Sequence, residues 1–263
     1  MNAERPEGRL SRREQIREAT LADIRKAARE LLVSKGSTAV TVNAVARKLG
    51  VSGPALYRYH ASQADLVKDL RKELFGELIE WLRQAGATPA ADTPARRLLT
   101  ITRALRGWAV SHRPEFCWLF ASPAPDVTCR DCAAYDRQSG RAFSQVFLEQ
   151  VAEIWETRRF PIPSLDDKDP SLARQIQVFS EDSIGGRLPP EAAYIFLHCW
   201  MRLYGLLCME ALNQISFALT DVEPVFEEYL QDLCSLLDVP YEEPGEILRT
   251  SSRNKNAAGN PAA

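Results

Sequence analysis

Apolar residues recur every three to four positions along most of the chain, which is the spacing of helices that bury one face. No stretch of the sequence alternates apolar and polar residues as a half-buried strand does. The pattern therefore predicts an all-α fold. Helices are expected at about 20–34, 42–49, 53–59, 62–82, 98–111, 116–120, 128–158, 171–181, 190–214 and 222–237.

The clearest part of this pattern is two short stretches with helical spacing, separated by a glycine. Gly50 can adopt the left-handed conformation that ends the first helix. Ser52 is a good N-cap for the second helix, and Pro54 lies in its first turn, where a missing N–H costs little. Ser62, with Asp65 three residues later, has the pattern of a capping box that starts a third helix. The arrangement predicts a helix-turn-helix whose second helix enters a DNA major groove.

This stretch resembles the DNA-binding domain of the TetR family of bacterial transcriptional regulators. The resemblance extends from Leu21 to Leu70 and includes the helix before the helix-turn-helix. The chain departs from the family's usual residues at Tyr59 (usually His), His60 (Phe), Gln63 (Lys) and Ala64 (Glu), which affects the expected phosphate contacts. The matching residues are Ile24, Ala27, Ala28, Leu31, Leu32, Gly36, Thr41, Val42, Val45, Ala46, Leu49, Gly50, Val51, Ser52, Ala55, Leu56, Tyr57, Tyr59, Ser62 and Leu66.

The resemblance implies that this domain contacts double-stranded operator DNA. Asn43 can pair with adenine, Arg58 with guanine, and Ala55 can contact a thymine methyl group. Base contacts are expected from Asn43, Gly53, Pro54, Ala55 and Arg58. Contacts with phosphates are expected from Thr41, Arg47, Ser52, Tyr57, Tyr59 and Gln63.

The chain is expected to have four parts. They are a flexible basic arm (1–17), a helix-turn-helix DNA-binding domain (18–68), a helical ligand-binding and dimerisation domain (69–248) and a disordered tail (249–263). The helix opened by Ser62 is long enough to pass from the first domain into the second. Only two stretches of the second domain, 112–116 and 200–207, resemble a C-terminal subgroup of the TetR family.

Large aromatic residues are concentrated in this second domain. Each can be ordinary core packing, but together they exceed what a helical core needs when leucine is available. Helical bundles build ligand sites between facing helices from such side chains. The resemblance implies a repressor that a small-molecule effector, apolar or aromatic in this case, releases from DNA. The expected ligand-binding residues are Trp108, Phe116, Tyr135, Phe143, Phe147, Trp200 and Tyr204.

The last two predicted helices, 190–214 and 222–237, are apolar on more than one face. A single subunit cannot easily bury that much apolar surface. We therefore expect a homodimer in which these two helices and their copies form a four-helix bundle. The expected dimerisation residues are Leu203, Leu206, Leu207, Phe226, Leu230 and Leu233.

Charge is distributed unevenly along the chain, although the net charge is only −2. The first 75 residues carry 15 Lys and Arg against 9 Asp and Glu, whereas the remainder is acidic. The asymmetry directs any attraction for phosphate to the N-terminal part. The five arginines of residues 1–17 form either an arm that contacts DNA or a solvated leader with a helical extension from Ser11.

Functions other than ligand-gated DNA binding would depend on the cysteines or on a catalytic motif in the sequence. Cys129 and Cys132 form a single CxxC, which lacks half the ligands of a structural zinc site but keeps a redox-gated or ligand-independent regulator open. No catalytic motif occurs, so no enzyme, metal or cofactor is expected. A small-molecule carrier or enzyme with a vestigial DNA-binding domain is the remaining alternative. No apolar run in the sequence approaches a membrane span, which predicts a cytoplasmic protein with no membrane partner.

Overall fold

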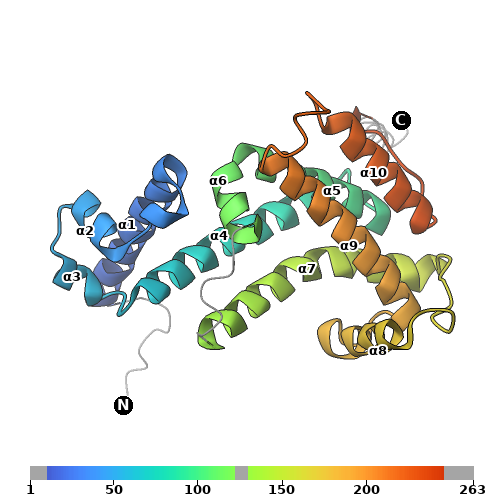
Figure 1. The fold of residues 1–263 in the computed structure, drawn as a ribbon, viewed down its shortest axis with the longest axis horizontal. Helices are drawn as coiled ribbons and strands as arrows, with labels where there is room; N and C mark the ends of the chain where they lie inside the picture. Colours follow the sequence, from blue (N-terminus) through green and yellow to red (C-terminus); the bar gives the residue numbers. More distant parts are fainter. Residues whose placement is uncertain (1–10, 122–129, 246–263) are drawn as a thin grey trace, which may run out of the picture. The chain divides into compact units, whose positions relative to one another are not determined.

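The computed structural model describes the backbone of residues 11–121 and 130–245, and their side chains except those of 130–137 and Ser183. Within these ranges every regular element is a helix (Figure 1). The all-α prediction is therefore confirmed. Contacts divide the described residues into two compact units, the first comprising 11–74 with 130–133 and the second 75–121 with 134–245.

The first unit consists of α1 (Arg12–Lys35), α2 (Val42–Leu49), α3 (Gly53–Tyr57) and the first part of α4 (Gln63–Gly86), with a 3-10 turn at Ser37–Ala39. Each helix turns its apolar stripe toward the others, so that one core forms. Its buried apolar residues are Ile24, Ala27, Ala28, Leu31, Leu32, Val40, Val42, Val45, Ala46, Leu56, Leu66, Leu70 and Leu74.

Helix α1 begins earlier than the apolar pattern predicts. Ser11 Oγ accepts a hydrogen bond from the Glu14 N–H, and the Ser11 N–H donates to Glu14 Oε2 at 2.8 Å, which makes a complete capping box. Residues 12–17 are therefore helical, as in the alternative of an extension from Ser11. This corrects the flexible arm predicted for 1–17 over these residues. Residues 1–10 lie outside the described part.

The second unit contains the rest of α4 and the helices that follow it. Helices α5 and α9 are in contact, and α9 also contacts α8 and α10. Two short π-helical segments, η2 and η3, extend α6 and α8 respectively. The bounds are Pro94–Ser111 for α5, Arg113–Phe116 for α6, Cys117–Ala121 for η2, Arg130–Arg158 for α7, Pro170–Val178 for α8, Phe179–Ser183 for η3, Pro190–Ala211 for α9 and Glu223–Leu236 for α10.

Helix α9 has an unusual composition for a helix of a packed unit. By length and hydropathy it meets the criteria for a membrane span, which corrects the expectation that no apolar run approaches one. It packs against α5, α8 and α10, and this packing accounts for part of its apolar surface. Only 33% of its most apolar window is buried within one subunit, however. Its exposed apolar side chains, Met201, Tyr204 and Met209, need another explanation.

Candidate DNA-binding face and apolar cavities

The turn between α2 and α3 has the backbone that its residues predict. Gly50 adopts the left-handed conformation with φ of 69°, and its N–H bonds back to the end of α2. Thr41 caps the start of α2 by accepting a hydrogen bond from the Ala44 N–H at 3.1 Å. Ser52 occupies the N-cap position of α3, although its hydroxyl caps no N–H. Helix α3 ends at Tyr57, two residues earlier than predicted.

Helices α2 and α3 meet closely at the expected base-reading residues. A Cβ atom placed on Gly53 would lie 3.2 Å from Asn43 Oδ1. A larger residue at position 53 would therefore press on the side chain of Asn43. The glycine lets the start of α3 and Asn43 occupy neighbouring positions on one surface.

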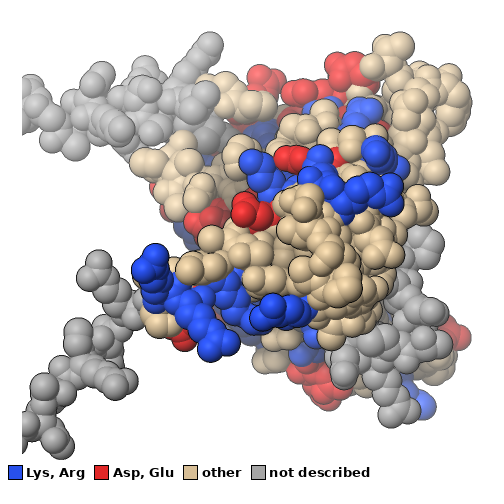
Figure 2. All heavy atoms as spheres, turned by 90° about the vertical axis from the view of Figure 1, so that its left-hand side faces the viewer, with Lys and Arg blue, Asp and Glu red and all other residues tan. Residues whose placement is uncertain are grey.

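The residues expected to contact DNA lie on the surface of the first unit. Asn43, Ser52, Pro54, Tyr57 and Arg58 are exposed. Thr41, Gly53, Ala55 and Tyr59 are half-buried. Figure 2 faces this side of the molecule and shows Lys and Arg side chains around an uncharged area. The exposed cations of the unit include Arg12, Arg13, Arg17, Arg47, Lys48 and Arg58.

Gln63 has a structural role that the sequence did not reveal. Its Oε1 atom accepts a hydrogen bond from the Val42 N–H at 2.9 Å, and its Nε2 atom donates to the Val40 carbonyl. The side chain thus joins the start of α4 to the start of α2. Both halves of its amide are engaged, so the phosphate contact expected from Gln63 stays a prediction that must compete with these bonds.

Two apolar cavities lined by described residues of the second unit lie against α9. The larger has about 330 Å³ of empty space, part of it open to solvent, and is lined by α5, α7, α9 and α10. Its two hydroxyl groups are already engaged, because Thr102 donates to the Leu98 carbonyl and Tyr229 to the Cys199 carbonyl. The lining consists of Leu98, Thr102, Phe147, Val151, Phe196, Cys199, Trp200, Leu203, Tyr229, Leu233 and Leu237.

The smaller cavity, of about 220 Å³, shares Trp200 and Leu203 with the larger one. Its wall is a cluster of aromatic rings, in which Phe120 lies 5.1 Å from Phe143 and 4.8 Å from Phe116 between ring centroids. The Tyr204 hydroxyl donates to the Phe120 carbonyl. The lining is Leu105, Phe116, Phe120, Phe143, Trp200, Leu203, Tyr204 and Leu207.

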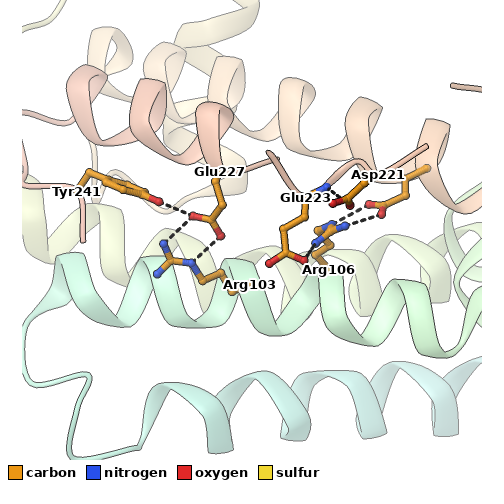
Figure 3. A network of polar contacts seen from close by, with 7 residues as sticks. Arg103, Arg106, Asp221, Glu223, Glu227 and Tyr241 are labelled. Atoms are coloured by element: carbon orange, nitrogen blue, oxygen red, sulfur yellow. Dashed lines mark hydrogen bonds and ion pairs between the residues drawn. The ribbon is translucent and has the colours of Figure 1, made fainter. Parts of the chain in front are cut away.

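Two arginines of α5, Arg103 and Arg106, form ion pairs with residues of α9 and α10. Arg103 binds both oxygens of Glu227, at 2.9 and 2.7 Å, and Tyr241 donates to the same carboxylate (Figure 3). One turn further, Arg106 binds Glu210 in α9 through two bonds of 2.9 and 2.8 Å, and also Glu223. These bidentate pairs fix α5 against α9 and α10.

Two family profiles match the chain. Residues 24–70 match the profile "Bacterial regulatory proteins, tetR family", and residues 98–233 match "Tetracyclin repressor-like, C-terminal domain". The second match alone covers more than half of the chain. The protein belongs to the TetR family. The resemblance expected from the helix-turn-helix residues is thereby confirmed.

Individual TetR-family relatives agree with this assignment. The HTH-type transcriptional regulators Mb1846 of Mycobacterium bovis and Rv1816 of Mycobacterium tuberculosis are each 32% identical over 146 residues, which is 55% of this chain. The matched stretch spans 61% of the length of these relatives. The crystal structure of the regulatory protein SCO4313 has a TM-score of 0.64 at 26% identity, covering 85% of this chain and 98% of that one. A TetR-family regulator from Shewanella sp. PV-4, at 12% identity and a TM-score of 0.52, shows the same fold.

The residues expected to bind a ligand in this TetR-family chain fall into three groups. Phe147 and Trp200 line the larger cavity, and Phe116, Phe143, Trp200 and Tyr204 line the smaller. Trp108 lines neither; it is buried and stacks on His112 at 4.9 Å. The side chain of Tyr135 is not described. The pattern missed Thr102 and Tyr229, whose only signal was their place on the apolar stripes of α5 and α10.

The structure corrects most of the dimerisation residues. Leu203, Leu207, Phe226, Leu230 and Leu233 are buried within a single subunit, where they pack α9 and α10 into the core. Only Leu206 is half-buried. The exposed apolar residues of this region are instead Met201, Tyr204, Met209 and Leu212, followed by Phe217, which is 87% exposed.

Two of the cysteines with described side chains, Cys199 and Cys234, are buried. Burial raises the pKa of the Cys199 thiol to about 11 and that of Cys234 to about 12, which keeps both protonated and unreactive. The redox-gating hypothesis rests on Cys129 and Cys132, whose side chains lie outside the described part. It stays a prediction.

Proposed function

We propose that this protein is a homodimeric transcriptional regulator of the TetR type, a repressor that an uncharged apolar small molecule releases from operator DNA. The observation that supports it most directly is the exposed surface of α2 and α3. Asn43 is exposed in α2, Tyr57 and Arg58 are exposed at the end of α3, and the same unit carries exposed Lys and Arg side chains. The cations supply attraction for phosphates, and the exposed amide and guanidinium supply base recognition.

The apolar cavities support the ligand part of the proposal. The larger one is lined almost wholly by apolar and aromatic side chains from four helices, as small-molecule pockets are. Each hydroxyl in the two linings donates to a backbone carbonyl, so a charged ligand would lose hydration without gaining a partner. The expected ligand is therefore uncharged and mostly apolar.

The proposal places the protein in the cytoplasm, where it would meet DNA. The exposed stripe of α9 supports the dimer, because a second copy of the same stripe would cover Met201, Met209 and Leu212. Ligand binding between α5, α7 and α9 would act on DNA through α4, which is continuous from Gln63 to Gly86 and so belongs to both units.

Two substitutions separate the expected kinds of DNA contact. Tyr57→Ala should weaken binding to all duplexes alike, because a phosphate contact carries no sequence information. Asn43→Ala should instead relax the preference at one base pair, by about 1–3 kcal/mol. Affinities measured by gel shift against the DNA upstream of this gene, and against single-base variants of it, provide the comparison. An Asn43→Ala protein that keeps the full preference would remove Asn43 from the base-reading residues.

Ligand and operator should weaken each other's binding by the same factor. A coupling free energy of about 1–3 kcal/mol corresponds to a 5–150-fold change in affinity. A panel of uncharged aromatic and aliphatic compounds can be screened by quenching of tryptophan fluorescence, since Trp200 lines both cavities. Each compound that binds is then titrated with and without operator DNA. Equal affinities in the two titrations would exclude ligand-gated release.

A further inference from the structure

His60 is a buried polar residue three positions after the last residue of α3. Only 4% of its surface is exposed. Its N–H donates to the Leu56 carbonyl at 3.1 Å, so the residue closes the last turn of α3. Its ring nitrogen Nε2 lies 3.1 Å from Oδ2 of Asp69 in α4. A single residue therefore holds the end of α3 and also reaches across to α4.

Asp69 extends this connection to α1. The same oxygen that meets His60 lies 3.3 Å from Nη1 of Arg25, and Arg25 also pairs with Glu73 one turn further along α4. The hydrogen bond with His60, together with the charge of Arg25, lowers the pKa of Asp69 although burial opposes this. Asp69 is thus ionised at neutral pH and accepts the proton that Nε2 carries.

The hydrogen bond has a direction that an apolar side chain at position 60 would lack. Where TetR-family chains have phenylalanine, packing alone fills the space. A hydrogen bond to a carboxylate is short and prefers a narrow range of angles, so it restricts the rotation of the segment that bears it. The other ring nitrogen, Nδ1, has no hydrogen-bond partner among the described residues. The contact with Asp69 is therefore what sets the orientation of the ring.

We propose that His60 is a positioning residue for operator recognition: its bond to Asp69 fixes the orientation of α3 relative to α1 and α4. This proposal rests on the proposed DNA-binding function. His60 is buried and cannot itself contact DNA, so it should affect the fit of the base-reading residues and not the general attraction for phosphates.

Substitution by the two amides tests the bond atom by atom. The amide nitrogen of glutamine reaches about as far from the backbone as Nε2 of histidine, whereas that of asparagine reaches only as far as Nδ1. His60→Gln should therefore keep the bond to Asp69 and His60→Asn should lose it. His60→Phe fills the space without the bond and serves as a second, well-packed variant.

The readout is the ratio of affinities for preferred and for unrelated duplex DNA, measured on the full chain below its melting temperature. We expect His60→Asn and His60→Phe to lower this ratio about tenfold, the equivalent of one base contact, with unchanged affinity for unrelated DNA. His60→Gln should keep the wild-type ratio. The proposal is overturned if His60→Phe keeps the ratio, or if His60→Gln loses as much as the others. A lower melting temperature with an unchanged ratio would likewise mean a purely structural role. Failure of the wild-type protein to prefer any sequence would instead reject the proposed function.

Discussion

Replacing Met201 and Leu212 together by glutamate is expected to give a monomer that binds operator DNA about 10²–10⁴-fold more weakly than the wild-type dimer. The two side chains are 51% and 42% exposed; Met201 lies in α9, and Leu212 directly follows the last residue of that helix, about three turns on. In a two-fold interface each new carboxylate would be buried against an apolar surface and its own copy. A monomer holds one reading head and loses the gain from binding two half-sites on one duplex. Light scattering measures the loss of the dimer, and gel shift measures the loss of operator affinity.

The control for this pair lies on α10. Gln231 is exposed on a polar face, so Gln231→Glu should leave the protein dimeric and able to bind DNA. Charges at Leu233, in contrast, should unfold the subunit, because that side chain is buried within it. A doubly substituted α9 that stays dimeric, or a wild-type protein that is already monomeric, would contradict the proposed interface.

Replacing Arg106 by methionine is expected to lower the free energy of unfolding by about 3–5 kcal/mol. The side chains of Arg106 and Glu210 are only 14% and 8% exposed. Burial alone would disfavour the charged arginine, but its bonds to Glu210 and Glu223 raise the pKa of Arg106, so it stays charged. Removal of the arginine leaves the Glu210 carboxylate buried without its bidentate partner. Denaturant unfolding at neutral pH measures the loss.

A surface pair of the same chemistry provides the matched control. Arg202 and Asp232 join α9 to α10 with side chains 45% and 60% exposed, so Arg202→Met should cost less than about 1 kcal/mol. Adding Glu210→Met to Arg106→Met should recover most of the lost stability, because no buried carboxylate then lacks its arginine. If Arg106→Met lowered the free energy of unfolding no more than Arg202→Met, the ion pairs of α5 would not contribute to stability as proposed.

The helix-turn-helix was predictable because its signals are local. Gly50 and Pro54 act through their own backbone angles, and Thr41 caps α2 by a hydrogen bond from the Ala44 N–H, only three residues on. The early start of α1 was readable from the same kind of signal, since Ser11 and Glu14 form a capping box. The spacing of apolar residues did not show it, because residues 12–17 are all exposed.

The remaining contacts were not predictable because they depend on tertiary packing. Arg103 pairs with Glu227, 124 residues away in the chain, and no local pattern connects them. Hydrophobicity identified α9 and α10 as apolar but could not tell which face enters the subunit's own core, so buried Leu230 was assigned to the dimer and exposed Met201 was not. Aromatic content likewise could not separate Trp200, at both cavities, from Trp108, which packs on His112.

Operator recognition by a dimer is the central claim, and selection of binding sites from random duplex DNA by the full chain tests it most directly. Two copies of α3 related by a two-fold axis should enrich an inverted repeat, with half-sites about one helical turn or a multiple of it apart. The preference should survive a rise in salt that removes binding to unrelated DNA. An enriched pool with no shared sequence, or with a single unrepeated half-site, would contradict the account.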